Sequence, residues 1–164
     1  MALSTEELER YNRNILLEGM GEEGQQRLKR AKVLVVGAGG LGSPVLYYLA
    51  AAGVGEIGIC DGDILDLSNL QRQILHNTQD LQKNKAQSAK EKLEILNTTL
   101  KINTHKERLN VNNILGILKD YDLVIEATDA FVSKFLVNDA CVLANKVLVR
   151  GSALHFCGQA MSIK

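Results

Sequence analysis

The chain has little that marks a nucleic-acid-binding or membrane protein. Its 164 residues contain no tryptophan and one proline, and 19 basic and 19 acidic residues cancel. No basic field is therefore present to hold a nucleic-acid backbone, and we do not expect nucleic acid as a main partner. No apolar run reaches membrane-spanning length, and residues 1–13 lack the apolar core of a signal peptide. We expect a cytoplasmic protein with no membrane partner.

Cysteine is also scarce. Cys60, Cys141 and Cys157 are far apart and form no C-x-x-C pair, so neither a zinc site nor a disulfide framework is indicated. We expect them to be small buried side chains in a reducing compartment. The three histidines share no metal-ligand spacing, and the G-x-x-x-x-G-K-[ST] motif of P-loop ATPases is missing from the sequence.

Hydrophobic residues make up 46% of the chain, enough for the core of one domain over residues 1–164. The predicted strands are 32–36, 56–60, 101–104, 123–126 and 147–151, and the predicted helices between them are 42–52, 84–97, 111–119 and 133–144. This alternation predicts an α/β fold, a Rossmann-like doubly wound and mostly parallel sheet with helices on both faces. Residues 159–164 alternate like a further strand.

An N-terminal helical segment precedes the sheet. Ser4 and Glu7 have the spacing of a capping box, which predicts a helix to about residue 11. A second helix is predicted over 22–30.

A glycine-rich turn after the first apolar run is the strongest functional signal. Residues 33–42 read V-L-V-V-G-A-G-G-L-G, and Asp61 follows the last glycine by about 20 residues. Gly37 permits the tight turn, Gly39 lets a ligand approach the backbone, and Gly42 lets the helix pack closely on the strand. Asp61 is placed to accept hydrogen bonds from a ribose. The pattern predicts nucleotide binding.

The polar loop after Asp61 offers groups for phosphate. Asn69, Gln71 and Arg72 lie beside the expected nucleotide crevice. Arg72 can hold phosphate oxygens through two parallel hydrogen bonds, and Lys85 adds a mobile point charge near the positive end of its helix. Each cation alone would be a solvated surface charge, but their position after the ribose-binding acid favours phosphate binding.

Asp129 follows the predicted strand 123–126, where open α/β sheets place their ligands. Mg²⁺ prefers one or two carboxylates together with phosphate oxygens and water, so Asp129 is a candidate magnesium ligand. The alternative is that Asp129 caps the following helix, a role that suits aspartate equally well.

These features occur together in one known family. The chain carries R-Y-N-R at 10–13, G-A-G-G-L-G at 37–42, A-A-G-V-G at 51–55, Asp61, Asp63, S-N-L-Q-R-Q at 68–73, Lys85 and A-T-D at 127–129. In order and spacing they resemble the ThiF/MoeB/HesA family, the bacterial relatives of ubiquitin-activating enzymes.

The resemblance implies an adenylyltransferase. In such an enzyme the C-terminal glycine carboxylate of a ubiquitin-fold sulfur-carrier protein attacks ATP bound with Mg²⁺, in a thiamin, molybdopterin or related sulfur-transfer pathway. The implied catalytic residues are Arg13, Arg72, Lys85 and Asp129, with Asp129 as the metal ligand. The implied nucleotide contacts are Gly37, Gly39, Gly40, Gly42, Asp61, Asp63, Ser68, Asn69, Gln71, Arg72 and Lys85.

The resemblance also bears on assembly and length. The family residue that matches Arg13 reaches into the partner's site as an arginine finger, which implies a homodimer with residues 1–30 as its dimerisation and arginine-finger segment. Some family members bind zinc through cysteine pairs, for which this chain has no ligands. Because the family continues beyond this point, we expect residues 1–164 to be its nucleotide-binding portion without the C-terminal part.

Two departures leave an alternative open. Ala130 stands where the family usually has asparagine, and Lys134 where it has arginine. The alternative is a non-catalytic nucleotide-binding or dimer-partner member of the same superfamily. An NAD-dependent oxidoreductase has only the glycine pattern in its favour, and the loop at 68–73 argues against it.

Overall fold

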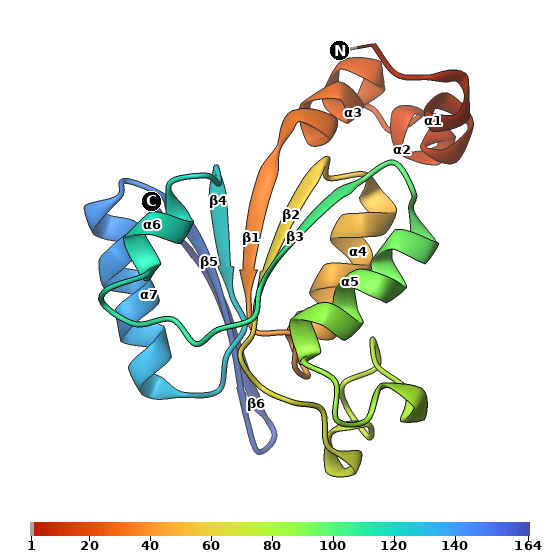
Figure 1. Cartoon of the computed structure of the whole chain (residues 1–164). Coiled ribbons are helices and arrows are strands. Elements are labelled where there is room, and N and C mark those ends of the chain that lie inside the picture. The colour runs from red at the N-terminus through yellow and green to blue at the C-terminus, as the bar shows by residue number, and fades with distance from the viewer. Residues whose placement is uncertain (1) are drawn as a thin grey trace.

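The computed structural model describes residues 2–164 and has a six-stranded sheet at its centre (Figure 1). The strands are β1 (Lys32–Val36), β2 (Glu56–Cys60), β3 (Lys101–His105), β4 (Leu123–Glu126), β5 (Val147–Leu154) and β6 (Cys157–Ile163). Their order is β3-β2-β1-β4-β5-β6, with all neighbours parallel except β5 and β6. The predicted α/β fold is confirmed.

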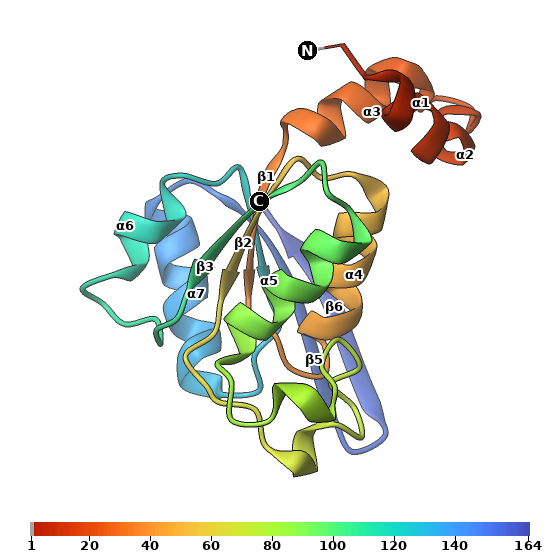
Figure 2. The same cartoon turned by 45° about the vertical axis from the view of Figure 1, so that its right-hand side comes forward.

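Helices cover the sheet on both faces. α4 (Gly42–Ala52) and α5 (Lys85–Leu96) lie on one face, and α6 (Ile114–Leu118) and α7 (Phe131–Leu143) on the other (Figures 1 and 2). Each face buries its own apolar cluster, one around Leu46, Ile57 and Leu93 and the other around Leu118 and Leu148. The sheet with its two helical layers therefore forms a rigid platform for the loops at its edges.

The N-terminal helices α1 (Thr5–Arg10), α2 (Asn12–Ile15) and α3 (Gly21–Arg30) gather beyond the amino ends of the strands, at the top of Figure 1. The predicted capping box is confirmed, because Ser4 Oγ accepts from the Glu7 amide at 3.2 Å and Glu7 Oε2 accepts from the Ser4 amide at 2.7 Å. Tyr11 anchors the segment, because its hydroxyl accepts from Asn97 Nδ2 at 2.8 Å and lies 3.4 Å from Thr99 Oγ1.

Some predicted boundaries are wrong. The helix predicted over 111–119 is α6, which begins only at Ile114, because Asn110 Oδ1 accepts from the Asn112 amide and Asn113 Oδ1 from the Asn110 amide, forming a turn instead. The helix predicted over 133–144 begins earlier, at Phe131. The alternation at the end of the sequence is confirmed as part of β6.

Cys60 and Cys141 are buried as predicted, but Cys157 is exposed. It lies on the edge strand β6, whose residues are almost all exposed, so nothing in the described part of the chain covers it. Within residues 2–164 the structure has no helix that is both long and apolar enough to cross a membrane.

Candidate nucleotide site

The strand order changes direction between β1 and β4, which are neighbours in the sheet although β2 and β3 come between them in sequence. Open α/β sheets bind ligands at such a switch point, outside the carboxyl ends of the strands. The glycine turn follows β1 and residues 127–129 follow β4, so the sheet brings both predicted segments to this point. They are in contact, because a Cβ added to Gly37 would lie 2.9 Å from the Ala127 carbonyl oxygen.

The glycine turn requires its glycines. Gly37 has φ of +97°, in the left-handed region that favours glycine. A Cβ on Gly42 would lie 1.9 Å from the Gly37 carbonyl oxygen, so the start of α4 closes tightly on the turn. The roles predicted for Gly37 and Gly42, a tight turn and close helix packing, agree with this geometry.

Asp61 holds the same turn from the end of β2. Its Oδ2 accepts from the Ala38 amide at 2.8 Å and its Oδ1 from the Asp63 amide at 2.9 Å. Each carboxylate oxygen has a second lone pair, so Asp61 retains the capacity to accept from a ribose hydroxyl. Its side chain is thus fixed before any ligand arrives.

His76 holds the other side of the Ala38 peptide. Its Nε2 lies 2.9 Å from the Ala38 carbonyl oxygen and its Nδ1 2.8 Å from Ser88 Oγ on α5. Because a carbonyl only accepts, Nε2 carries the proton, and in the neutral ring Nδ1 accepts from the serine hydroxyl. Burial lowers the pKa of His76, and the Ala38 hydrogen bond and nearby acidic groups oppose this shift without reversing it. A neutral imidazole therefore joins the turn to α5.

The loop predicted to handle phosphate lies against the turn. The Arg72 side chain runs across Gly40, with its Cγ 3.4 Å from the position of a Cβ there. The residue is exposed, and its Nη1 donates to the Ser68 carbonyl oxygen at 3.4 Å. Ser68 and Gln71 are also exposed, and Asn69 Oδ1 accepts from the Asp66 amide at 3.2 Å. The structure therefore brings Arg72 to the crevice with Gly40, as predicted.

Lys85 is less free than predicted. It is only 8% exposed, and its Nζ lies 3.4 Å from Asp63 Oδ2, so it is not a mobile point charge. Asn84 Nδ2 donates to the carbonyl oxygens of Asp61 and Asp63, which ties the start of α5 to the end of β2. Burial acts to raise the pKa of Asp63, but the hydrogen bond from Arg108 and the Lys85 charge outweigh it and hold the pKa below its ordinary value. Lys85 is thus a buried cation in a fixed position.

Asp129 lies in the loop after β4 and is exposed. Ala130, not Asp129, occupies the N-cap position of α7, so the capping role considered for Asp129 is wrong. No hydrogen bond or ion pair among residues 2–164 engages its carboxylate. The same residues contain no group of three or more His, Cys, Asp or Glu side chains placed to hold a metal. A single free carboxylate fits Mg²⁺ where phosphate oxygens and water supply the other ligands.

Arg13 lies away from the other site residues. It is exposed on α2, next to Tyr11, which packs on Gly53 at the C-terminal end of α4, whereas the glycine turn meets the N-terminal end of that helix. The 11 residues of α4 therefore place the Tyr11 contact about 16 Å from the glycine turn. The structure therefore does not bring Arg13 to this chain's own crevice.

Four residues around the crevice were not foreseen. His76, Gln73, Glu126 and Lys134 are all at least nine-tenths buried. Gln73 places its amide nitrogen beside Gly39, while its Oε1 has no hydrogen-bond partner among the described residues. The sequence carried a signal for three of them: Gln73 ends the S-N-L-Q-R-Q run, Lys134 departs from the family pattern, and Glu126 is a charged residue at the end of an otherwise apolar strand.

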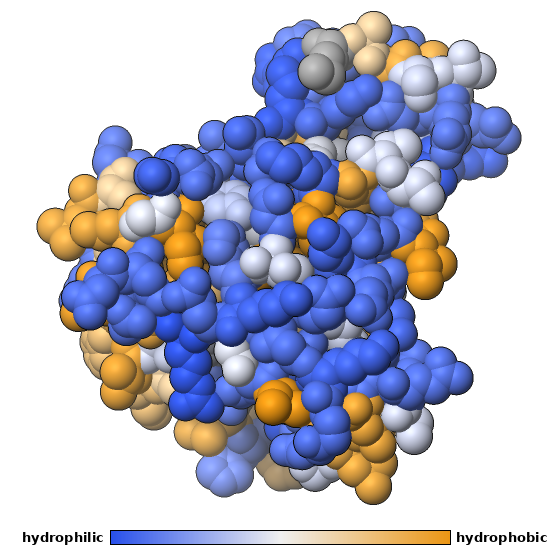
Figure 3. All heavy atoms as spheres, viewed as in Figure 1, coloured by the Kyte–Doolittle hydropathy of each residue, from blue (hydrophilic) through white to orange (hydrophobic). Residues whose placement is uncertain are grey.

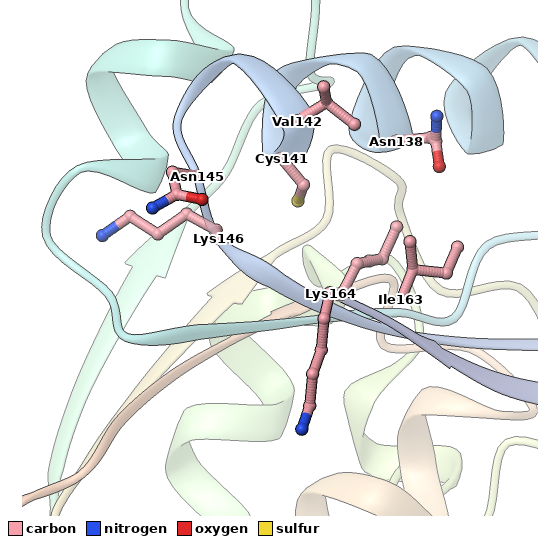
Figure 4. Close-up of a pocket in the computed structure, with 8 residues that line it drawn as sticks. Asn138, Cys141, Val142, Asn145, Lys146, Ile163 and Lys164 are labelled. Atoms are coloured by element: carbon pink, nitrogen blue, oxygen red, sulfur yellow. The ribbon is translucent and has the colours of Figure 1, made fainter.

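Of two pockets next to the sheet, one adjoins the crevice and the other lies far from it. A cavity of about 240 Å³ adjoins it, lined by Leu41 and Pro44 of the turn and α4 and by Ala127 and Gly151. A smaller pocket of about 130 Å³ lies between α7 and the end of β6, with Asn145 and Lys146 at the amino end of β5 (Figure 4). This second pocket is at the opposite end of the strands from the glycine turn and is not part of the candidate site.

Comparison with known proteins agrees with this geometry. The ThiF family model matches residues 11–164. The chain is 51% identical over 159 residues to the probable adenylyltransferase/sulfurtransferase MoeZ of Mycobacterium tuberculosis, covering 97% of this chain and 41% of that protein. It is 50% identical over 159 residues to the sulfur carrier protein adenylyltransferase of Thermus thermophilus, covering 97% and 59%.

A solved structure extends the comparison to a nucleotide complex. E. coli tRNA N6-threonylcarbamoyladenosine dehydratase, TcdA, in complex with ATP, aligns with a TM-score of 0.86 and 25% identity over 94% of this chain and 65% of that chain. The chain thus spans about half the length of the curated relatives it matches.

Proposed function

This chain belongs to the ThiF family, and we propose that it forms the nucleotide-binding part of an adenylyltransferase that activates the C-terminal glycine carboxylate of a ubiquitin-fold sulfur-carrier protein with ATP. The observation that carries the proposal is that the glycine turn, Arg72 and Asp129 lie at the switch point, with Lys85 held on Asp63 after the neighbouring strand β2. A dinucleotide would use the turn and Asp61 but would leave this set of phosphate-binding groups unused.

The nucleotide would lie along the turn. Asp61, already oriented by the Ala38 amide, would accept from the ribose, and the turn allows close approach of phosphate because its residues carry little side chain. The ATP complex of TcdA supports nucleotide binding by this fold.

The chemistry would consist of positioning and charge compensation. A carboxylate is a weak nucleophile, so the site must align it with the α-phosphate and stabilise the charge of the departing pyrophosphate. Arg72 and the fixed cation Lys85 would provide positive charge on the phosphate side. When bound, Mg²⁺ would offset phosphate charge, and Asp129 is the residue that would hold it.

The names of the relatives support the carrier as substrate. The Thermus thermophilus relative is a sulfur carrier protein adenylyltransferase, and MoeZ is a probable adenylyltransferase/sulfurtransferase. For this protein, we propose the same adenylyltransferase activity and a ubiquitin-fold sulfur carrier as the partner.

Arg13 would act on a second copy of the chain. It lies about a helix length from its own crevice, beyond the reach of an arginine side chain, so a role in catalysis requires a homodimer in which it enters the partner's site.

Two measurements test the proposal. Isothermal titration should show tighter binding of ATP with Mg²⁺ than of NAD, and carrier-dependent ATP–pyrophosphate exchange should depend on Arg72 and Lys85. Equal or tighter binding of NAD would contradict it in favour of an oxidoreductase. ATP binding with no carrier-dependent exchange would favour the non-catalytic alternative. The specific observation for that alternative is Ala130, which stands where the family usually has asparagine.

A further inference from the structure

Two buried charged residues lie directly behind the loop that carries Asp129. Glu126 ends β4 and is fully buried, and Lys134, on the first turns of α7, is 4% exposed. Lys134 Nζ lies 3.0 Å from Glu126 Oε2. A buried ion pair is costly unless further hydrogen bonds satisfy both partners, so its remaining contacts indicate what the pair holds in place.

Those contacts converge on the Thr128 backbone. Lys134 Nζ donates to the Thr128 carbonyl oxygen at 2.7 Å and to the Gly151 carbonyl oxygen on β5 at 3.0 Å. Glu126 Oε1 accepts from the Thr128 amide at 2.8 Å and from the Thr128 hydroxyl. The pair therefore holds both the amide and the carbonyl group of the residue before Asp129, and uses all three protons of the ammonium.

This backbone has little room to move on its other side. The Ala127 carbonyl and the Thr128 amide pack against Gly37, within 2.9 and 3.3 Å of the position that a Cβ would take there. Asp129 is exposed and its carboxylate has no hydrogen bond among the described residues, so its backbone, which sets the position of Cα and the direction of the Cα–Cβ bond, is what places it.

We infer that Lys134 and Glu126 are positioning residues that fix the Thr128 backbone and thereby aim the Asp129 carboxylate at the Mg²⁺ and phosphates of the nucleotide. This inference rests on the proposed function, which assigns Asp129 to Mg²⁺. It also accounts for Lys134, one of the two residues that depart from the family pattern, because its three donors match three acceptors: Glu126 Oε2 and the Thr128 and Gly151 carbonyl oxygens.

The test compares ATP affinity with Mg²⁺ and with EDTA by isothermal titration. The ratio of the two dissociation constants isolates the metal-dependent part of binding, which a general loss of stability would not change selectively. Variants are Asp129→Asn, Lys134→Met, Lys134→Arg and the double variant Glu126→Gln/Lys134→Met, which removes both buried charges together. Lys29→Met, which breaks the ion pair with Glu7 in the N-terminal segment, is the matched control.

We expect Lys134→Met to lose stability in urea, because it leaves the buried Glu126 with only the longer ion pair to Arg150 Nε, at 3.7 Å. The double variant should regain much of that stability, yet its Mg²⁺-dependent gain in ATP affinity should fall by about 10-fold or more, as for lost support of a metal ligand. Lys134→Arg, which keeps the charge, should restore most of the gain, and Lys29→Met should leave it unchanged. Without any nucleotide, hydrogen exchange of the Thr128 amide should be faster in the double variant.

A stable double variant with the wild-type ratio and unchanged Thr128 exchange would overturn the inference and leave the proposed function intact. A wild-type protein whose ATP affinity is the same with Mg²⁺ and EDTA, and is unaffected by Asp129→Asn, would overturn the assignment of Asp129 to Mg²⁺ and the inference with it.

Discussion

At the residue scale, the Ala38 peptide is the best-defined point of the crevice. Asp61 accepts from its amide and His76 donates to its carbonyl oxygen, so the turn is held from the end of β2 on one side and, through the His76–Ser88 hydrogen bond, from α5 on the other. Neither contact requires a ligand. The site is therefore organised in advance, which lowers the conformational entropy that the protein loses when a nucleotide binds.

Removing the Asp61 carboxylate tests this point. We expect Asp61→Ala to weaken ATP binding by about 1 to 3 kcal/mol, the usual cost of losing hydrogen bonds to a charged group. Isothermal titration measures the change, with Asp139→Ala, an exposed carboxylate on α7, as the control. Equal affinities for Asp61→Ala and wild type would contradict the role of Asp61.

His76 predicts a pH dependence of stability. Its folded pKa lies below the ordinary value of 6.5, so the unfolded chain binds a proton more readily than the folded one. The contribution of the neutral ring is complete above pH 6.5 and is lost as the pH falls below it. The difference in unfolding free energy between wild type and His76→Gln should therefore shrink from pH 7.5 to pH 5.5, as measured by urea denaturation. A difference that stays constant from pH 7.5 to pH 5.5 would contradict this prediction.

At the element scale, the sequence predicts the features that depend on residues close together in the chain. It does not predict contacts between residues that only the folded structure brings together. Strands, most helices and the glycine turn follow from local periodicity and from glycine at fixed spacing. The predicted start of α6 was wrong because asparagine side chains compete with helix formation for hydrogen bonds to nearby backbone amides. The contact of His76 with Ala38 and that of Lys134 with Gly151 join residues far apart in sequence, and no local pattern encodes such contacts.

The junction of β1 and α4 gives a prediction for an element. Gly42→Ala should destabilise the protein by about 3 kcal/mol or more, because its Cβ would lie 1.9 Å from backbone at Gly37, which cannot move aside cheaply. Gly116→Ala in α6 is the matched control, because its Cβ would meet open space, and it should stabilise the protein by about 0.5 to 1 kcal/mol. Urea denaturation measures the unfolding free energy of both variants. Similar changes in that free energy would refute the close-packing explanation.

At the scale of the whole molecule, two surfaces are left without a partner in the described chain. Large apolar side chains of α7, Phe131, Val132, Phe135, Val142 and Leu143, are exposed, and hydrophobic surface gathers on the side of α6 and α7 (Figure 3). The N-terminal segment exposes Leu16 and Leu17 beside Arg13, at the end of the sheet opposite the crevice. The proposed homodimer would have to bring Arg13 of one copy to the crevice of the other.

The position of Arg13 predicts that activity can be shared between subunits. Arg13→Ala and Lys85→Ala should each lose most of the carrier-dependent ATP–pyrophosphate exchange, for different reasons: the first lacks the group given to the partner, and the second lacks a group of its own site. A mixed dimer holds one site with Lys85 from one subunit and Arg13 from the other. An equimolar mixture should therefore recover about a quarter of the wild-type rate, because random exchange makes half of the dimers mixed and each has one complete site.

Two controls show whether recovered activity in the mixture comes from mixed dimers. Arg30→Ala removes an exposed arginine of α3 and should retain activity alone. Subunit exchange is followed independently, with differently tagged chains co-purified from the mixture. If exchange is demonstrated and the activity of the mixture stays at that of the single variants, then Arg13 does not act across a dimer interface. Its distance of about a helix length from its own crevice would then also exclude it from catalysis within one chain.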